Sequence, residues 1–401
     1  MKARPILERV KWLGAIDWDR RLFDALIPLP DGTSYNAYLV EGSQKTVLLD
    51  TVDPPMTEVL LRQLESVPRI DYVVSQHAEQ DHAGAIPAVL ARYPEAELLC
   101  SKKARGMLLE LLDLDAYRIR VVEDGEALSL GDRSLKFIYT PWVHWPETMV
   151  SYLQEDRVLF SCDFFGSHIA ASELFVADPG RVLEAAKRYF AEIMMPFRAV
   201  IAKNLEKLEG YPVDLIAPSH GQVYGRPSLI LDAYRDWVLG EPRNLAVLAY
   251  VSMHGSTRRM VDRLAGALVE RGVEVESYSL PETDIGKLAM SLVDAGTIVI
   301  GTPTVLTGPH PAAAYAAVLA NALRPKARFL SIIGSYGWGG KAVETLASLV
   351  PRLEVEVLDP VLCMGLPGEA DEQALDALAE KIAAKHAEQG FAKRSERNRF
   401  D

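Results

Sequence analysis

Four side chains able to bind a metal ion fall within six consecutive residues, namely His77, Glu79, Asp81 and His82. They directly follow a short β-branched run over residues 71–75, which predicts that they lie in a loop at a strand end. In an extended loop, residues two apart point the same way, so we expect His77, Glu79 and Asp81 to converge while His82 faces another direction. One loop is thereby predicted to serve two coordination spheres.

Three further candidates stand singly after other β-type runs. They are His144 in Pro-Trp-Val-His-Trp-Pro, Asp163 in Ser-Cys-Asp-Phe-Phe, and His220 in Pro-Ser-His-Gly. Each one alone would be interpreted as an ordinary core histidine or a turn-forming aspartate. Three histidines and three carboxylates in loops of one domain instead predict a metal centre, and five such groups with one bridging aspartate suit two ions.

Strand and helix patterns predict an α/β protein of two domains. The first domain, residues 1–240, is a mixed α/β region whose β-type runs include 45–50, 97–100, 133–140 and 157–162. A helical pattern stops at Gly240 and resumes only after Pro242, which favours a boundary there.

In the second domain, residues 244–401, strands and helices alternate at short spacing. This rhythm predicts a doubly wound parallel sheet of five strands in the order 2-1-3-4-5, with the last strand at 355–358, a closing helix at 371–388 and a frayed tail at 393–401.

Three loops of the second domain contain the residue types of a phosphate and flavin site. The first leads into a helix with hydroxyls and backbone amides that can bind a phosphate without lysine. The expected binding residues are Ser252, Met253, His254, Gly255, Ser256 and Thr257 in the first loop, Pro303, Thr304 and Val305 in the second, and Ser335, Tyr336, Gly337, Trp338 and Gly339 in the third. Each loop alone is ordinary turn chemistry, but the strand order brings all three to one switch point, where Tyr336 or Trp338 can stack on a flavin ring. The chain has no G-x-G-x-x-G fingerprint, which favours FMN over a dinucleotide.

Composition excludes several classes of protein. Hydrophobic residues make up 49% and charged residues 24%, which is typical of globular chains and excludes overall disorder. The net charge of −12 and the lack of long basic runs argue against a nucleic-acid partner. Three scattered cysteines with no C-x-x-C pair, no signal-peptide pattern and no long apolar run predict a cytoplasmic protein that does not span a membrane.

The first domain resembles the metallo-β-lactamase fold, an αββα sandwich, through the H-x-E-x-D-H loop and the separate His, Asp and His positions. Its zinc hydrolases usually have His at the second position, whereas Glu79 is an oxygen donor that suits iron. With a flavodoxin-like second domain, the chain resembles the flavodiiron proteins, or A-type flavoproteins. This resemblance implies that His77, Glu79 and His144 hold one iron, that Asp81 and His220 hold the other, and that Asp163 bridges them. It gives His82 the role of a proton donor and not of a ligand.

The resemblance implies an oxidoreductase that takes electrons through FMN to two irons per chain and reduces dioxygen to water or nitric oxide to nitrous oxide. It also implies a head-to-tail homodimer supplied by rubredoxin or by a reduced deazaflavin coenzyme. The chain departs from the family in two regions. Phe23-Asp24-Ala25 stands where many members have Phe-His-Gly and is followed by the Pro-rich stretch Pro28 to Gly32, and Val305, Leu306 and Thr307 stand where the family often has an Asn after Pro-Thr. The alternative is a metal-dependent hydrolase of the metallo-β-lactamase fold with an accessory flavodoxin-like domain.

Overall fold

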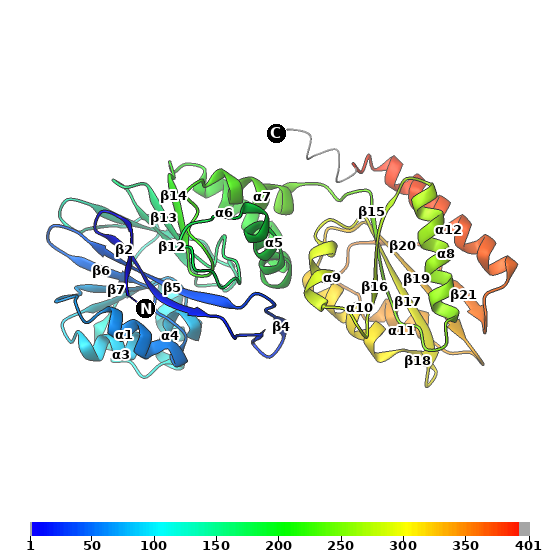
Figure 1. Ribbon diagram of the computed structural model, residues 1–401, viewed down its shortest axis with the longest axis horizontal. Coiled ribbons are helices and arrows are strands. Elements are labelled where there is room, and N and C mark those ends of the chain that lie inside the picture. The colour runs from blue at the N-terminus through cyan, green and yellow to red at the C-terminus, as the bar shows by residue number, and fades with distance from the viewer. Residues whose placement is uncertain (1, 393–401) are drawn as a thin grey trace. The chain divides into compact units, whose positions relative to one another are not determined.

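The computed structural model describes residues 2–392, so the expectation of a frayed tail at 393–401 lies outside the described residues. The chain divides into two units (Figure 1). The first comprises the residues up to Tyr189 and Phe197–Val238, and the second comprises Phe190–Pro196 and the residues from Leu239 onward.

Two mixed β-sheets form the centre of the first unit. The seven-stranded sheet has the order β1 (Arg4–Leu7), β2 (Val10–Asp17), β5 (Thr33–Glu41), β6 (Thr46–Leu49), β7 (Tyr72–Ser75), β8 (Glu97–Cys100), β9 (Ile119–Val121). The five-stranded sheet has the order β10 (Ala127–Ser129), β11 (Ser134–Tyr139), β12 (Met149–Leu153), β13 (Val158–Cys162), β14 (Leu215–Pro218). A small separate hairpin joins β3 (Leu22–Phe23) to β4 (Ile27–Pro28).

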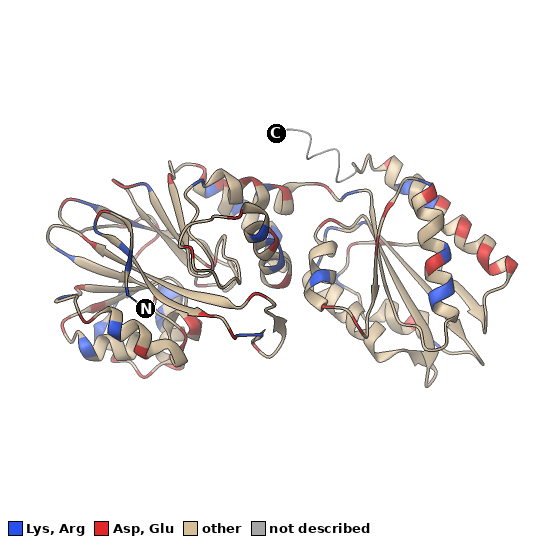
Figure 2. Cartoon of the chain, in the orientation of Figure 1, with Lys and Arg blue, Asp and Glu red and all other residues tan. Residues whose placement is uncertain are grey.

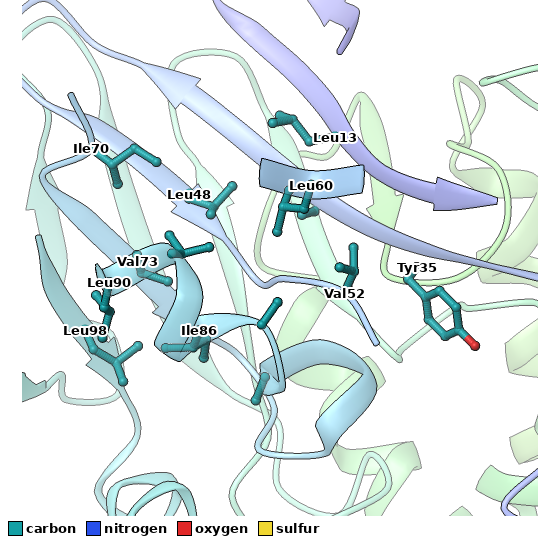
Figure 3. Packing of buried hydrophobic residues seen from close by; sticks show 14 of the residues in the cluster. Leu13, Tyr35, Leu48, Val52, Leu60, Ile70, Val73, Ile86, Leu90 and Leu98 are labelled. Atoms are coloured by element: carbon teal, nitrogen blue, oxygen red, sulfur yellow. The ribbon is translucent and has the colours of Figure 1, made fainter. Parts of the chain in front are cut away.

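Successive side chains of β6 point to opposite faces of the sheet, and each face is covered by its own hydrophobic core. Val47 and Leu49 belong to the core between the two sheets, whereas Leu48 belongs to the core on the other side of its sheet. That outer core contains Leu60 of α1 (Thr57–Gln63) and Ile86 of α3 (Ile86–Arg92), and it is shown in Figure 3.

The second sheet is covered in the same way. Leu159 of β13 and Ile216 of β14 line a cavity of about 270 Å³ together with Leu205 of α6 (Arg198–Leu208) and Leu231 of α7 (Ser228–Leu239). Helices therefore cover the outer faces of both sheets, and the expected αββα sandwich is confirmed.

The second unit is a parallel sheet with helices on its faces. Its order is β16 (Glu274–Ser279), β15 (Leu245–Tyr250), β17 (Thr297–Val305), β19 (Phe329–Tyr336), β20 (Glu356–Val357), which confirms the order 2-1-3-4-5. The helices are α8 (Ser256–Glu270), α9 (Ile285–Leu292), α10 (Pro311–Leu323), α11 (Ala342–Ser348) and α12 (Glu369–Glu388). Basic residues of α8 pair with acidic residues of α12, as in Arg259–Glu372 and Arg263–Asp376 (Figure 2). Among residues 2–392, no helix is both long enough and apolar enough to cross a membrane.

The fifth strand differs from the expected run over 355–358. The structure divides it into β20 and a second piece, β21 (Val361–Met364), and both pair with β19. Pro360 lies between the two pieces and has no N–H to donate, so the ladder is interrupted there. The second piece extends the sheet toward the carboxyl edge, where Ser335 pairs with Cys363.

Candidate functional site

The loop after β7 is extended only in its first half. Glu79 has an extended backbone and directly precedes a short helix, α2 (Gln80–Ala83). Because the backbone turns helical at Gln80, Asp81 does not continue the alternation of His77 and Glu79. The expectation that His77, Glu79 and Asp81 converge on one side is therefore wrong for Asp81, which joins His82 and His220 instead.

The first set of donors consists of His77, Glu79, His144 and Asp163. Nε2 of His77 lies 3.0 Å from Oε2 of Glu79, and Nε2 of His144 lies 3.2 Å from the same oxygen. Both ring nitrogens are 3.4 Å from Oδ2 of Asp163. Loops after β7, β11 and β13 thus bring two nitrogen and two carboxylate donors to one point.

The second set of donors consists of Asp81, His82 and His220. Nε2 of His220 lies 3.2 Å from Oδ2 of Asp81, and Nε2 of His82 lies 3.3 Å from Oδ1. Oδ1 of Asp163 is 3.1 Å from Nε2 of His82 and 3.5 Å from Nε2 of His220. The sequence resemblance gave His82 no ligand role, whereas the structure places its ring nitrogen at the same spacing as that of His220.

Asp163 connects the two sets, because Oδ2 faces the first and Oδ1 faces the second. All four carboxylate oxygens of Asp81 and Asp163 are buried, and within the described part of the chain they have no conventional hydrogen-bond donor. Donor atoms bound to one ion at about 2.1 Å lie roughly 3.0 to 3.4 Å apart, which is close to the observed spacing. Nitrogen and oxygen donors of this kind fit two transition-metal ions bridged by Asp163.

The charges within the cluster favour a buried cation. Burial alone would raise the pKa of Asp163, but the surrounding rings, that of His82 first, lower it well below its usual range. Burial opposes protonation of His82, yet the carboxylates of Asp81 and Asp163 raise its pKa to about 10. The anionic oxygens therefore need compensating positive charge, and metal ions would provide it.

Several supporting residues were not found by sequence reasoning. Glu147 lies 2.6 Å from Nδ1 of His77, and the backbone carbonyl of Ser34 lies 2.7 Å from Nδ1 of His220. The fully buried Asp50 accepts hydrogen bonds from the backbone and side-chain amides of Gln76. None of these residues lies in a motif, so no sequence signal separates Glu147 from a surface glutamate in a turn.

The wall beside His220 contains a further histidine that the sequence did not indicate. The His168 ring centroid is 4.8 Å from that of His220, and Nδ1 of His168 is 2.9 Å from the hydroxyl of Thr33. Burial lowers the pKa of His168 well below its ordinary value, which keeps this ring neutral. The ring centroid of Phe23 lies 5.1 Å from that of His168. The segment Phe23-Asp24-Ala25, which differs from the family pattern, therefore borders the candidate metal site.

Asp24 is the residue at which the sequence resemblance predicts a histidine. Its φ of 49° lies in the left-handed region that aspartate tolerates. Burial, followed by the charges of Glu79 and Asp81, raises the pKa of Asp24. The segment therefore presents a carboxyl group near the cluster instead of an imidazole.

The three predicted loops lie at the carboxyl ends of β15, β17 and β19, which are neighbours in the sheet, but Pro303, Thr304 and Val305 are the last residues of β17, and Ser335 and Tyr336 are the last residues of β19. In the first loop, Gly255 directly precedes α8 and has a φ of 92°. Residues other than glycine rarely adopt this backbone conformation. The hydroxyl of Thr257 is 3.1 Å from that of Ser335, which joins the first loop to the third. The backbone N–H of Lys341 donates to the carbonyl of Thr307 at 2.8 Å, which joins the third loop to the second.

These loops line a cavity and carry exposed apolar side chains. A cavity of about 410 Å³ is lined by Thr302, Thr304, Ser335, Tyr336, Gly339 and Gly340 among others, which is the size of a small-molecule pocket. Met253, Leu306 and Trp338 are 51%, 91% and 83% exposed at the same edge of the sheet. Exposed apolar side chains around a pocket are typical of a binding site that a ligand or a partner covers.

Known proteins are similar in sequence to both units of this chain. Residues 33–221 match the profile of the ODP family beta lactamase. The chain is 35% identical over 395 residues to a nitric oxide reductase of Moorella thermoacetica, covering 96% of this chain and 98% of the relative. It is 32% identical over 399 residues to a coenzyme F420H(2) oxidase of Methanothermobacter marburgensis, covering 96% and 98%.

Two solved structures extend this similarity to nearly the whole chain. The rubredoxin oxygen:oxidoreductase of Desulfovibrio gigas superposes with a TM-score of 0.91 at 33% identity, covering 96% of this chain and 98% of that one. The flavodiiron protein of Giardia intestinalis superposes with a TM-score of 0.90 at 26% identity, covering 98% and 99%.

Proposed function

Because the chain belongs to the flavodiiron family of oxidoreductases, also called type A flavoproteins, we propose that it reduces dioxygen to water, nitric oxide to nitrous oxide, or both. The observation that carries this proposal is the pair of donor sets that share Asp163, with Glu79 in the first. A carboxylate at this position favours a redox-active ion over zinc, which argues against the hydrolase alternative.

We assign residues 1–240 to two irons and residues 244–401 to FMN. His77, Glu79 and His144 hold one iron, Asp81 and His220 hold the other, and Asp163 bridges them. The spacing of 3.1 Å and 3.3 Å to two carboxylates favours His82 as a further ligand of the second iron, in place of the proton-donor role suggested by the resemblance. When bound, the irons supply electrons to the gas, and FMN relays electrons to them from a donor.

The chain's own residues prepare both sites. The hydroxyls and amides of residues 252–257, at the start of α8, bind the phosphate of FMN. Pro303, Thr304 and Val305 on one side and Ser335 to Gly339 on the other would hold the flavin ring, and Tyr336 or Trp338 would supply an aromatic ring to stack on it. Around the irons, buried apolar walls such as Phe23 and Tyr35 exclude water.

Assembly and electron supply follow from the same proposal. We propose a head-to-tail homodimer in which the flavin of one chain serves the irons of the other. The relatives' names point to rubredoxin or to the reduced deazaflavin coenzyme F420 as the class of donor. Three buried cysteines without a disulfide support a reducing compartment, the cytoplasm.

Metal and flavin analysis with gas uptake tests the proposal. Purified protein supplied with iron should contain about two irons and one FMN per chain and should consume dioxygen or nitric oxide when a reduced donor is present. Asp163→Ala should lose both irons and gas reduction while it keeps FMN. A preparation that is fully active with zinc and no iron would instead support the hydrolase.

A further inference from the structure

The two metal sets differ in what supports their histidines. Nδ1 of His77 faces the Oε1 atom of Glu147 at 2.6 Å, whereas Nδ1 of His220 faces the backbone carbonyl of Ser34 at 2.7 Å. Both rings point Nε2 into their donor sets. One histidine is therefore supported by an anion and the other by a neutral dipole.

Glu147 is held firmly in this position. Its side chain is fully buried, and Oε1 also accepts the backbone N–H of Ala78 at 3.1 Å. The hydroxyl of Ser101 donates to the backbone carbonyl of Glu147 at 2.7 Å, and the N–H of Met149 donates to the carbonyl of Gln76 at 3.0 Å. The segment that carries Glu147 is thus tied to the loop that carries His77.

This contact determines which ring nitrogen carries the proton. The N–H of Ala78 lies within 3.0 Å of Nδ1 of His77 as well, and it could donate there if Nδ1 were unprotonated. When Nε2 binds a metal ion, the proton must sit on Nδ1. It then points at Oε1 of Glu147, which also accepts the backbone N–H of Ala78.

Both sets have a buried carboxylate beside a donor histidine: Glu147 beside His77 in the first, and Asp50 within 4.8 Å of a ring nitrogen of His82 in the second. The first offers His77, His144 and Glu79, the second offers His82, His220 and Asp81, and both share Asp163. A carboxylate that accepts the Nδ1 proton makes the imidazole a stronger donor, and a carbonyl does so less. Glu147 contacts the ring of His77 directly, whereas Asp50 accepts its hydrogen bonds from Gln76 and Ser219, so Glu147 acts on a donor histidine by direct contact.

We propose that Glu147 is a positioning residue that holds His77 in the Nδ1–H form and makes the ion of the His77–Glu79–His144 set the more readily oxidised of the two. This inference rests on the proposed diiron function. It predicts that the two irons have distinct reduction potentials and that the difference depends on Glu147.

The test compares Glu147→Gln with Glu110→Gln, which removes an exposed carboxylate from the same unit. Circular dichroism monitors folding, iron is titrated into the full-length protein, and the two potentials are measured by redox titration followed by electron paramagnetic resonance. In Glu147→Gln we expect iron affinity to fall roughly 10- to 100-fold and the lower potential to rise toward the higher one. Glu110→Gln should change neither.

The outcomes separate this inference from the proposed function. If the unaltered chain binds no iron, the proposed function fails. If it binds two irons, and Glu147→Gln folds with unchanged iron affinity and unchanged potentials, the role of Glu147 is refuted.

A second measurement covers the case in which Glu147→Gln does not fold. Zinc-loaded, unaltered protein with ¹⁵N-labelled histidine should show an Nδ1-bound ring proton shifted far downfield by the carboxylate. Absence of that proton signal would overturn the proposal.

Discussion

Nε2 of His82 lies 3.1 Å from Oδ1 of Asp163, the oxygen that also faces His220 at 3.5 Å. This relationship puts His82 within the second donor set. His82→Ala should therefore remove about one of the two irons and leave FMN unchanged, because the remaining donors hold the second ion weakly. Iron and flavin counting on the purified variant gives the answer. Retention of both irons with slowed turnover would restore the proton-donor role.

Gly255 has a φ of 92° at the start of α8, and we expect Gly255→Val to weaken FMN binding at least tenfold. A β-branched residue at positive φ costs about 1 to 3 kcal/mol and moves the backbone amides that would face the phosphate. Gly266→Ala is the matched control, because Gly266 lies within the same helix and its added Cβ would contact nothing within 4 Å. That control should keep FMN affinity and stabilise the second unit by about 0.5 to 1 kcal/mol. Equal FMN affinity in both variants, measured by fluorescence quenching, would remove the first loop from the site.

The stability of the second unit should fall below neutral pH because of His386. The buried ring contacts the hydroxyl of Thr297 at 2.7 Å and Oδ1 of Asn244 at 2.8 Å, and burial lowers its pKa from 6.5 to about 4. The unfolded chain binds this proton more readily than the folded chain does. The contribution of neutral His386 to the free energy of unfolding is therefore complete above about pH 6.5 and declines by about 1.4 kcal/mol per pH unit down to about pH 4. The free energy of unfolding should fall by about 3 kcal/mol in total between these two pH values.

Hydrogen exchange of the β17 amides at several pH values checks this prediction. The exchange rates are compared with those of His386→Gln at the same pH, so that the intrinsic pH dependence of exchange cancels. The difference between the two proteins should shrink as pH falls from 6.5 to 4, whereas the exposed His254→Gln should match the unaltered chain throughout. A pH-independent difference would show that His386 does not titrate in this window.

The proposed head-to-tail dimer predicts complementation between two inactive variants. Gly255→Val from which the weakly bound FMN has been removed has no flavin, and Asp163→Ala has no iron, but a mixed dimer has one intact flavin facing one intact iron pair. After random exchange, about one quarter of the original activity should return. Native mass spectrometry measures exchange and gas uptake measures turnover. Complete exchange without turnover would mean that electrons pass within a single chain.

The sequence by itself predicted the metal-binding types of side chain that lie together, the two domain patterns and the strand order of the second unit. Those features depend on local information: the close spacing of His77, Glu79 and Asp81, the β-type runs before His144, Asp163 and His220, and regular strand–helix alternation. The prediction that residues 252–257 bind a phosphate is equally local, because it depends on hydroxyls and a glycine directly before a helix.

Only the tertiary structure decided how those donors are divided and supported. The helical turn at Gln80 sends Asp81 to the second set, and a pattern of residue types does not reveal where an extended loop becomes helical. The contact of His77 with Glu147 joins residues 70 positions apart, and that of His220 with Ser34 joins residues 186 positions apart. Such contacts arise from packing of the two sheets, and a side chain's burial and partner depend on what the rest of the chain brings beside it.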